Sequence, residues 1–375
     1  MQKYVFKSQN FESIQLPTIK EKRGKEWIDF GSNNLYPQLL IELYNNSAMH
    51  HTAIEAIVDG VVGEGFKQFG DEFVNSENET MDEIFEKIAR DYELFGGYAL
   101  NVIWSRDGEN IAEMYHLPFN NVRSGLMNED EKVEQYWYCS DWLQYRKYKP
   151  VSYPCFSATD NEGDDASQIY YFSDYTVGQY YYPLPSYVGA INDIDTDARI
   201  SRFHANNLKN GLAPSMMLTF RNGIPTPDEQ DEIWKDIEKT FAGEENAGQF
   251  FLNFSEPGRE PTVEAIENAN DDYYVTLETR ITSRILTAHR ITSPLLLGIK
   301  DASGFSSNAD EINTAYNHFM GTVIRPDQKK LVRSFNKLIN MTGRTIKLEI
   351  EPAKILYTVQ VDGVDQDVEP DQNNQ

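Results

Sequence analysis

Apolar residues recur at helical spacing in several separate stretches of the chain. The clearest stretch runs from Ile84 to Phe95, follows a capping box over Thr80–Glu83, and ends at Gly96. A second capping box lies over Thr226–Glu229, with a proline at the first helical position. The same spacing predicts further helices over about residues 37–60 (with a break near 45), 190–210, 226–242, 273–292, 308–322 and 326–340.

Alternating apolar and polar residues predict strands between these helices. Tyr98–Trp104 and a return strand ending at Leu117 flank an Asp107-Gly108 turn, which is typical of a β-hairpin. Twelve tyrosines lie between residues 136 and 187, where we expect several short antiparallel strands. A closing hairpin is predicted over Thr345–Ile350 and Lys354–Val361. Helices mixed with small antiparallel sheets indicate an α+β fold.

The tyrosine-rich stretch has two interpretations. Exposed tyrosines can form a sugar-binding face, which would suit an acidic carbohydrate-binding protein or a glycosidase-like enzyme. A half-buried sheet or a subunit interface explains the same composition, because tyrosine combines a large apolar ring with a polar tip. We favour the second interpretation, and the first remains the alternative function.

The residue types needed for catalysis are present without the spacing that catalysis requires. The glycines of Gly60–Phe66 follow a helix instead of opening one, which indicates a helix stop and not a phosphate-binding loop. The six histidines show no metal-binding spacing, and the two cysteines, Cys139 and Cys155, exclude a disulfide scaffold and suggest free thiols. With 59 acidic residues, carboxylate pairs arise by chance. We therefore expect no catalytic residue, no metal and no cofactor.

The charge of the chain limits its possible partners. Its 375 residues include 34 Lys and Arg against 59 Asp and Glu, a formal net charge of −25. A broad nucleic-acid-binding face needs clustered cations, which this composition disfavours, although an acidic wall can still guide DNA by repelling it. We find no signal peptide and no apolar run of membrane-spanning length, and we expect a soluble intracellular chain.

Four sequence features follow one another in an order that resembles a known family. The helix ending in Asp91–Ala99, the Asp107-Gly108 hairpin and Tyr115–Pro118 are similar to the wing of tailed-phage portal proteins, the head-tail connector rings of the HK97-like type. The resemblance extends equally to portal proteins of the SPP1-like type. Phe203–Leu218 resembles the passage from the first portal stem helix into the clip. The longest match is Arg280–Asn340, with a stem helix, a Pro-apolar-Gly step, a polar loop and a helix that stops at Ile324-Arg325-Pro326.

The resemblance implies a portal fold with a wing, a two-helix stem and an α/β clip. The usual Val-Pro-Pro step is here Thr292-Ser293-Pro294, and the chain ends soon after the closing hairpin, so we expect no large crown. The expected divisions are an N-terminal arm (1–34), the first part of the wing (35–189), stem helix 1 (190–210), the clip (211–267), stem helix 2 (268–293), the tunnel loop and wing helices (294–345), the closing β-hairpin (346–361) and an acidic disordered tail (362–375).

The family's function would follow from this fold. The resemblance implies a homo-oligomeric ring, typically of twelve subunits, at one vertex of the capsid, with double-stranded DNA passing non-specifically through its axis. Terminase, a head-tail connector or adaptor, and the major capsid or scaffolding protein would be its partners. The protein would reside in the virion after assembly in the host cytoplasm, without enzymatic activity and without contact with a membrane.

Two sets of residues are candidates for contact with DNA and with partners. A polar loop between two helices is expected to be the tunnel loop, in which Lys300 makes brief phosphate contacts; its members are Lys300, Asp301, Ser303, Gly304, Phe305, Ser306 and Ser307. Residues 226–272 carry 14 acids and 3 bases, so the capped helix there is expected to face terminase or the connector; its candidate residues are Asp228, Glu229, Asp231 and Glu232.

Overall fold

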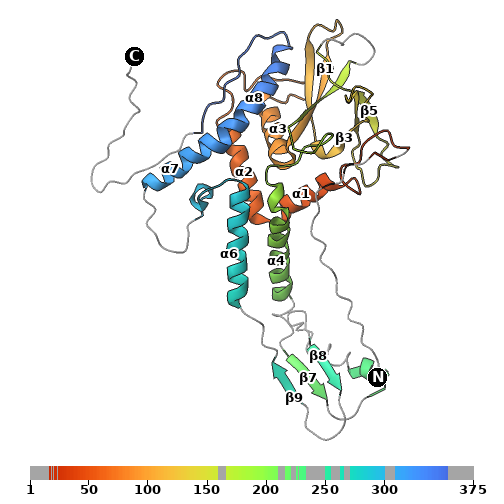
Figure 1. Cartoon of the computed structure of the whole chain (residues 1–375), viewed down its shortest axis with the longest axis vertical. Helices are drawn as coiled ribbons and strands as arrows, with labels where there is room; N and C mark the ends of the chain where they lie inside the picture. Colours follow the sequence, from red (N-terminus) through yellow and green to blue (C-terminus); the bar gives the residue numbers. More distant parts are fainter. Residues whose placement is uncertain are drawn as a thin grey trace, which may run out of the picture.

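The computed structural model shows an elongated chain with three parts (Figure 1). A mixed helix and sheet body lies at one end, a pair of helices extends from it, and a small sheet lies at the far end of the pair. We call these the body, the helix pair and the distal sheet. The residues that the structure describes are 17, 19, 21–22, 24–158, 166–209, 216–220, 225–226, 228–233, 250–254, 262–265, 271–299 and 309–353.

Helices form the centre of the body. The first two, α1 (Tyr36–Asn46) and α2 (Ala48–Val62), are separated by Ser47, whose side chain accepts a hydrogen bond from the backbone N–H of His50 and so begins α2. The predicted break near residue 45 is confirmed. Helix α3 (Met81–Phe95) has both hydrogen bonds of the predicted capping box and ends at Gly96 in the left-handed conformation.

Two three-stranded antiparallel sheets pack around these helices. The first has the order β2-β1-β6, formed by β1 (Gly97–Trp104), β2 (Ile111–Leu117) and β6 (Ser167–Ser173). The second has the order β3-β4-β5, formed by β3 (Val122–Ser124), β4 (Gln135–Tyr138) and β5 (Val151–Pro154). A 3-10 turn over Phe119–Asn121 joins them. Nine of the twelve tyrosines between residues 136 and 187 are buried or half-buried, as a role in a half-buried sheet requires.

The last helices of the body differ from the prediction. Helix α7 (Ala309–Phe319) passes through a π-helical segment (Met320–Ile324) directly into α8 (Arg325–Asn340). The predicted stop at Ile324-Arg325-Pro326 is therefore wrong. Pro326 lies in the first turn of α8, where proline fits, and the wider π-turn before it spaces the backbone so that the helical path continues.

The predicted closing hairpin is also different in its first half. Residues 344–349 contain no strand, and this segment instead lies along the loop after α2. The Glu64 N–H donates to Glu351 O (2.8 Å), the Glu351 N–H donates to Gly65 O (2.8 Å), and the Lys67 N–H donates to Glu349 O (2.9 Å). Gly63 makes this approach possible, because a Cβ atom there would lie 2.4 Å from Glu351 O. The second arm, from residue 354, lies outside the described residues.

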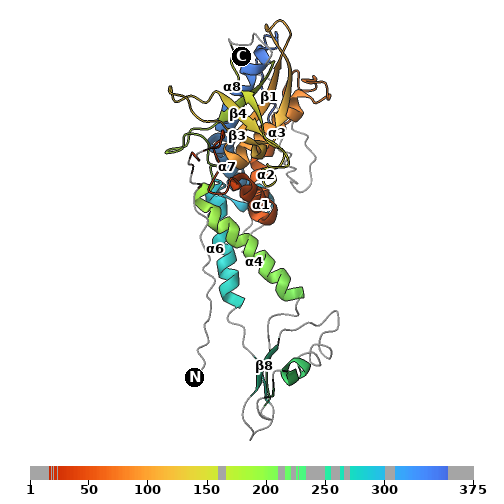
Figure 2. The same cartoon turned by 90° about the vertical axis from the view of Figure 1, so that its right-hand side faces the viewer.

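The helix pair consists of α4 (Ile191–Lys209) and α6 (Asp271–Ala288), which lie side by side in both views (Figures 1 and 2). Arg284 Nη1 lies 2.9 Å from Asp193 Oδ1 near the body, and His204 Nε2 lies 3.1 Å from Glu278 Oε1 further along the pair. A 3-10 turn over Val188–Ala190 leads into α4, and another over Pro294–Leu297 follows α6.

The distal sheet has three strands in the order β8-β7-β9. Strand β7 (Met216–Phe220) pairs in parallel with β8 (Phe250–Phe254) and antiparallel with β9 (Thr262–Ala265). A parallel pair needs a crossover connection, and the helical residues 228–233 lie within that connection.

Part of the segment expected to be an N-terminal arm (1–34) packs into the body. The side chains of Ile28 and Phe30 are fully buried, and Phe30 stacks on Tyr182 with ring centres 4.0 Å apart. The Ile28 N–H donates to Ser124 O at 2.8 Å. Residues 27–30 therefore pack beside β3 as part of the body.

A buried arginine holds this segment in place. The Arg123 side chain is fully buried and donates from Nε to Asn34 Oδ1 (2.5 Å), from Nη2 to Asn34 O (2.8 Å), and from Nη1 to Asn120 O (2.9 Å) and Val122 O (2.8 Å). Its guanidinium also lies over the Trp142 ring, 4.8 Å from the ring centre. Burial lowers the pKa of Arg123 to about 10, which leaves it charged at pH 7.

We predict that Arg123→Met destabilises the protein although it leaves the site apolar and filled. The change removes four hydrogen bonds to buried oxygens, of which Asn34 Oδ1 keeps the Phe30 N–H and Asn120 O keeps Gln38 Nε2 as donors. Each oxygen left without a donor costs about 1–3 kcal/mol. The expected result is a large fall in melting temperature, measured by differential scanning fluorimetry, with Arg123→Lys intermediate. A melting temperature for Arg123→Met within a degree of the wild type would contradict this role.

Candidate functional site

The predicted clip acids lie on the short helix near the distal sheet. Asp228, Glu229, Asp231 and Glu232 are all exposed. The Glu229 carboxylate accepts hydrogen bonds from the Thr226 backbone N–H (2.8 Å) and from the Thr226 hydroxyl (2.9 Å), which is the reciprocal half of the predicted capping box. Glu229 therefore has a local structural role, whereas the other three carboxylates point outward without that role.

The predicted tunnel loop, Lys300–Ser307, lies outside the described residues, and its placement stays a prediction. The elements on either side of it are described. Before the loop, Ser293 accepts from the Leu295 N–H (3.3 Å) to begin the 3-10 turn, and Gly298 ends that turn at φ 73°. After the loop, α7 begins at Ala309.

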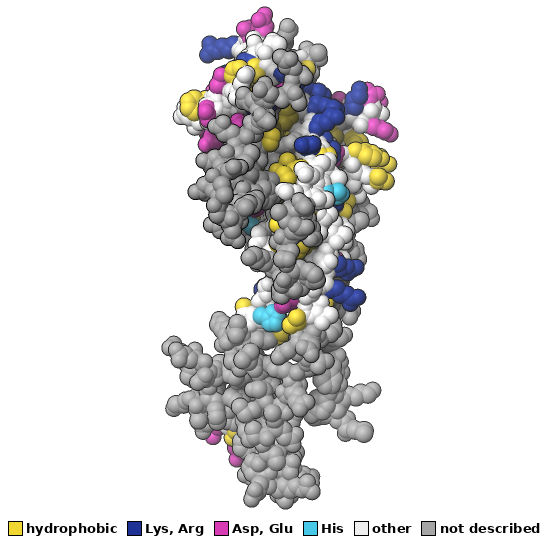
Figure 3. Space-filling view, turned by 90° about the vertical axis from the view of Figure 1, so that its left-hand side faces the viewer, with side chains coloured by type: hydrophobic (Ala, Val, Ile, Leu, Met, Phe, Trp, Pro, Cys, Tyr) yellow, Lys and Arg dark blue, Asp and Glu magenta, His cyan; other side chains and the backbone are white. Residues whose placement is uncertain are grey.

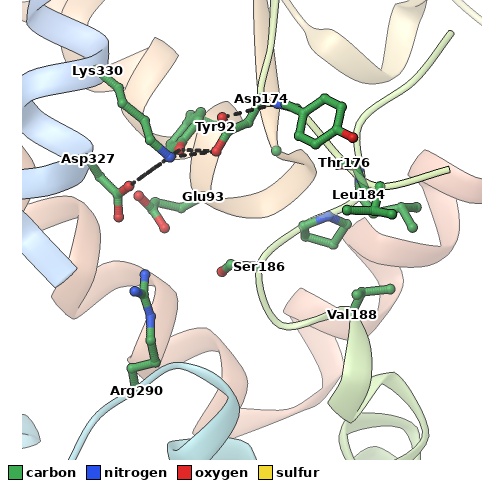
Figure 4. A pocket seen from close by; sticks show the side chains of 14 residues that line it. Tyr92, Glu93, Asp174, Thr176, Leu184, Ser186, Val188, Arg290, Asp327 and Lys330 are labelled. Carbon is green, nitrogen blue, oxygen red and sulfur yellow. Dashed lines mark hydrogen bonds and ion pairs between the residues drawn. The ribbon is translucent and has the colours of Figure 1, made fainter. Parts of the chain in front are cut away.

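The described body contains a cavity that sequence reasoning did not anticipate. It has a volume of about 490 Å³ and lies where the end of α3, the first two turns of α8 and Arg290, two residues after α6, approach the segment between β6 and α4 (Figure 4). Gly96 makes this approach possible, because a Cβ atom there would lie 2.7 Å from Leu184 O.

Lys330 is the centre of a polar network on one side of the cavity. Its Nζ lies 2.6 Å from Asp174 Oδ2, 3.0 Å from Tyr92 Oη and 3.7 Å from Asp327 Oδ1. The Tyr92 hydroxyl donates to Asp174 Oδ2 at 3.0 Å. Two carboxylates therefore share one ammonium group (Figure 4).

Glu93 is a buried carboxyl group in this cavity whose hydrogen bonds are incomplete. It is only 5% exposed, and its Oε1 atom has no hydrogen-bond partner within the described part of the chain. Burial raises the pKa of Glu93 to about 8, the Asp327 carboxylate adds to this effect, and Arg290 and Lys330 oppose it. Figure 4 shows the Glu93 and Asp327 carboxyl groups directed into the same space.

Arg290 points toward these carboxyl groups from below in Figure 4. It lies two residues after α6 in the left-handed conformation, at φ 57°, which is unusual for a residue other than glycine. Its Nη1 donates to Thr322 O at 3.2 Å, which links the end of α6 to the π-helical segment. The cavity thus lies at the junction of the body and the helix pair.

The sequence gives one indication of this site, an acidic residue at a helix position where a negative charge is unfavourable. Glu93 places a negative charge in the last turn of a helix, where the helix dipole disfavours it. It also lies among Tyr92, Leu94 and Phe95, so that the last turn of α3 is buried on every side. Its cation neighbours, Arg290 and Lys330, lie 197 and 237 residues further along the sequence, which no local pattern reveals.

A pair of histidines is buried beside the same junction. His50 Nδ1 and His289 Nε2 are 2.9 Å apart, and the rings are 0% and 2% exposed. Burial lowers the pKa of His289 to about 4 and that of His50 well below its usual value, so both rings are neutral at pH 7. This pair joins α2 to the end of α6 through a neutral hydrogen bond.

The surface of α8 has the opposite charge to the chain as a whole. The helix contains five basic residues and one acid, and its exposed bases include Arg325, Lys329, Arg333 and Lys337. Figure 3 views the molecule from the side of α7 and α8, where Lys and Arg side chains gather on the body and others lie on the helix pair. Exposed Arg280 and Arg284 belong to α6.

Two kinds of site are not found in the described residues. No group of three or more His, Cys, Asp or Glu side chains there is arranged to hold a metal ion. No helix in the same residues is both long enough and apolar enough to cross a bilayer.

Comparison with known families gives one match. The model of the family described as phage portal protein matches residues 72–360, more than three quarters of the chain. No curated protein sequence matches significantly.

Comparison with solved structures gives matches of similar extent. The neck of an empty gene transfer agent (GTA) particle, computed with C6 symmetry, contains a chain that aligns at 14% identity with a TM-score of 0.54, covering 84% of both chains. The neck of the native GTA particle, computed with C12 symmetry, aligns at 15% identity with a TM-score of 0.53, covering 87% of this chain and 84% of that chain. These two alignments show a shared fold.

A crystal structure of an HK97-family phage portal protein from Corynebacterium diphtheriae aligns at 13% identity with a TM-score of 0.47. It covers 80% of this chain and 89% of that chain.

We predict that Glu93→Gln changes the pH dependence of stability. The pKa of Glu93 is about 8 in the folded chain and near 4.5 when unfolded, so folding takes up a proton between these values. The wild type therefore loses stability as the pH rises from 5 to 9, by about 1.4 kcal/mol for each unit of pKa shift. The amide cannot ionise, so the variant should have the higher melting temperature at pH 9 and a similar one at pH 5.

The matched control is Glu86→Gln, on the solvent side of the same helix, where an exposed ion pair with Arg90 contributes little. Its melting curve should follow the wild type at every pH. Parallel pH profiles for the wild type and Glu93→Gln would show that Glu93 ionises normally in the folded protein.

Proposed function

The chain belongs to the phage portal protein family, and from this premise we propose that it assembles into a closed ring, of twelve subunits, at one vertex of a capsid. DNA enters and leaves through the axis of that ring. The observation that supports this best is the shared architecture of body, helix pair and distal sheet, which aligns over more than four fifths of the chain with chains from particle necks.

The three parts of the chain have natural assignments in such a ring. The body is the wing, the helix pair is the stem, and the distal sheet with its capped helix is the clip. The stem helices present exposed polar residues over most of their length, which suits a position between neighbouring subunits and a water-filled channel. We keep the tunnel loop between the stem and α7 as part of this assignment.

The acidic charge of the chain fits a channel through which DNA slides. Twelve subunits with a net charge of −25 carry on the order of 300 negative charges, and this field keeps the contact with phosphate groups weak. We assign brief, sequence-independent contacts to Lys300 in the tunnel loop, through charge and backbone amides. The protein performs no catalytic step in this assignment; terminase supplies the work of packaging.

The alternative of a carbohydrate-binding protein or glycosidase has no support from the comparisons. Most tyrosines of the stretch that suggested it are packed into the body, where Tyr136, Tyr182 and Tyr187 are buried.

The ring itself is tested by imaging the purified chain. We expect negative-stain micrographs to show rings with a central hole, and mass photometry to give a mass close to twelve chains of 43.1 kDa. A single species of one chain's mass, at micromolar concentration and physiological salt and in the presence of the scaffolding protein, would contradict the proposal.

The docking role of the clip helix is tested by charge reversal. We predict that Asp228→Lys, Asp231→Lys and Glu232→Lys together lower terminase-dependent DNA packaging at least tenfold, because a basic docking surface would meet repulsion. Glu229 is kept because it caps the helix. Ring assembly, followed by electron microscopy, should be unchanged.

The matched control reverses three exposed acids of the body, Glu77, Glu109 and Glu129, with the same total change in charge. It should package DNA normally. Equal packaging by the clip variant and the control would remove this helix from the terminase-docking surface.

A further inference from the structure

We propose that the cavity at Glu93 receives a cationic side chain, an arginine or a lysine, from residues 141–149 of a neighbouring copy of this chain. The proposal rests on the ring put forward above, and it identifies one contact that joins adjacent subunits. The cavity supplies the buried carboxyl group and an apolar rim, and the loop supplies the cation and an apolar surround.

The cavity is incomplete within a single chain. Lys330 is already engaged by Asp174 and Asp327 at 2.6 and 3.7 Å, and Arg290 donates to Thr322 O. Glu93 is left with an oxygen that has no partner among the described residues, at only 5% exposure. A buried carboxyl group in this position is costly, and a further cation held in the cavity would offset that cost through its charge.

The rim of the cavity has the character of a protein interface. Tyr175 and Val177 line the cavity and yet are 85% and 82% exposed, and Tyr180, in the same segment, is 84% exposed. Large apolar side chains this exposed are typical of contact surfaces that a partner covers. An apolar rim around a buried charged group is the arrangement found at the energetic centre of many interfaces.

Residues 141–149 offer the complementary surface. Arg146, Lys147 and Lys149 are all exposed, and Leu143 (69% exposed) and Tyr148 (41% exposed) lie among them. In a chain with a net charge of −25, three cations within four positions are a local reversal of sign. The segment therefore carries both the charge and the apolar contacts that the cavity requires.

The loop is also held in a fixed shape. Trp142 is 3% exposed, lies over Arg123 and donates from Nε1 to Asn121 O at 2.9 Å. At the other end, Cys139 Sγ lies 2.9 Å from Tyr148 O. A preorganised loop loses little conformational freedom on docking, so its contacts contribute more fully to the free energy of binding.

The position of the two surfaces suits a ring. In a closed ring every interface joins one surface of a subunit to a different surface of the next. The cavity is lined by α8 and by the segment after β6, whereas residues 141–149 follow β4, so the two surfaces come from different segments of the body. Repetition of one contact between them therefore propagates around the ring.

Disulfide cross-linking tests the contact directly. Val177→Cys and Leu143→Cys are introduced together, both at exposed positions, and assembled rings are oxidised with copper phenanthroline. We expect a ladder of covalent multimers on a non-reducing gel. The control pair, Val177→Cys with Phe73→Cys, uses another exposed position of the body, and the wild type, with Cys139 and Cys155, gives the background.

A second experiment removes the basic side chains of the loop and measures ring assembly. Changing Arg146, Lys147 and Lys149 together to Gln should raise the protein concentration needed for half-assembly at least tenfold. Changing Lys329, Arg333 and Lys337 of α8 to Gln, an equal loss of charge, should not. Glu93→Gln should weaken assembly as well, although it raises the melting temperature of the unassembled chain at pH 9, and a purely structural role would not separate these two effects.

The outcomes show separately whether the proposed contact fails and whether the proposed ring fails. Wild-type rings that form while the 143/177 pair cross-links no more than the control pair would overturn the docking of this loop and leave the ring intact. Unchanged assembly of both the loop variant and Glu93→Gln would overturn it equally. A wild type that forms no rings would overturn the proposed function and this contact together.

Discussion

The contact between α2 and the residue that follows α6 joins the helix pair to the body. His50 and His289 meet there at 2.9 Å, and the Tyr187 ring lies 4.4 Å from one imidazole and 5.1 Å from the other. Because both histidines are neutral, the contact needs no counter-charge inside the body. Helix α6, with 18 residues, is about 27 Å long, so a small tilt at this point becomes a displacement of several ångströms at the distal sheet.

The junction brings the end of α6, the π-helical segment and the Glu93 cavity together. Arg290 lies two residues after α6, bonds to Thr322 in the π-helical segment, and points toward the carboxyl groups of Glu93 and Asp327. A change in the charge of the cavity therefore acts on the residue that fixes the end of α6. The charge of the cavity and the direction of the helix pair are thus connected through a single arginine.

The sequence was a good guide wherever a local rule decides the outcome. The Thr80–Glu83 capping box, the Gly96 stop and the Asp107-Gly108 hairpin were all predictable, because caps and turns depend on neighbouring residues. The continuous helix through Pro326 and the pairing of residues 349–351 with the loop after α2 were not, since both depend on contacts made far away in the chain. The cavity was not predicted for the same reason, because the charged neighbours of Glu93, namely Asp327, Lys330 and Arg290, come from distant parts of the chain. The predicted clip acids and tunnel loop remain predictions.

The π-helical segment between α7 and α8 has a geometric consequence. One extra residue in a helical turn rotates everything before it by about 100° relative to everything after it. The apolar stripe of α8 faces the core through Leu331, Phe335 and Leu338, and a regular helix would have continued that stripe into α7. The rotation instead turns α7 toward the 3-10 turn at Pro294–Leu297. One continuous helical segment, from α7 through the π-helical turn into α8, therefore packs against two surfaces that face in different directions, and no loop is needed between them.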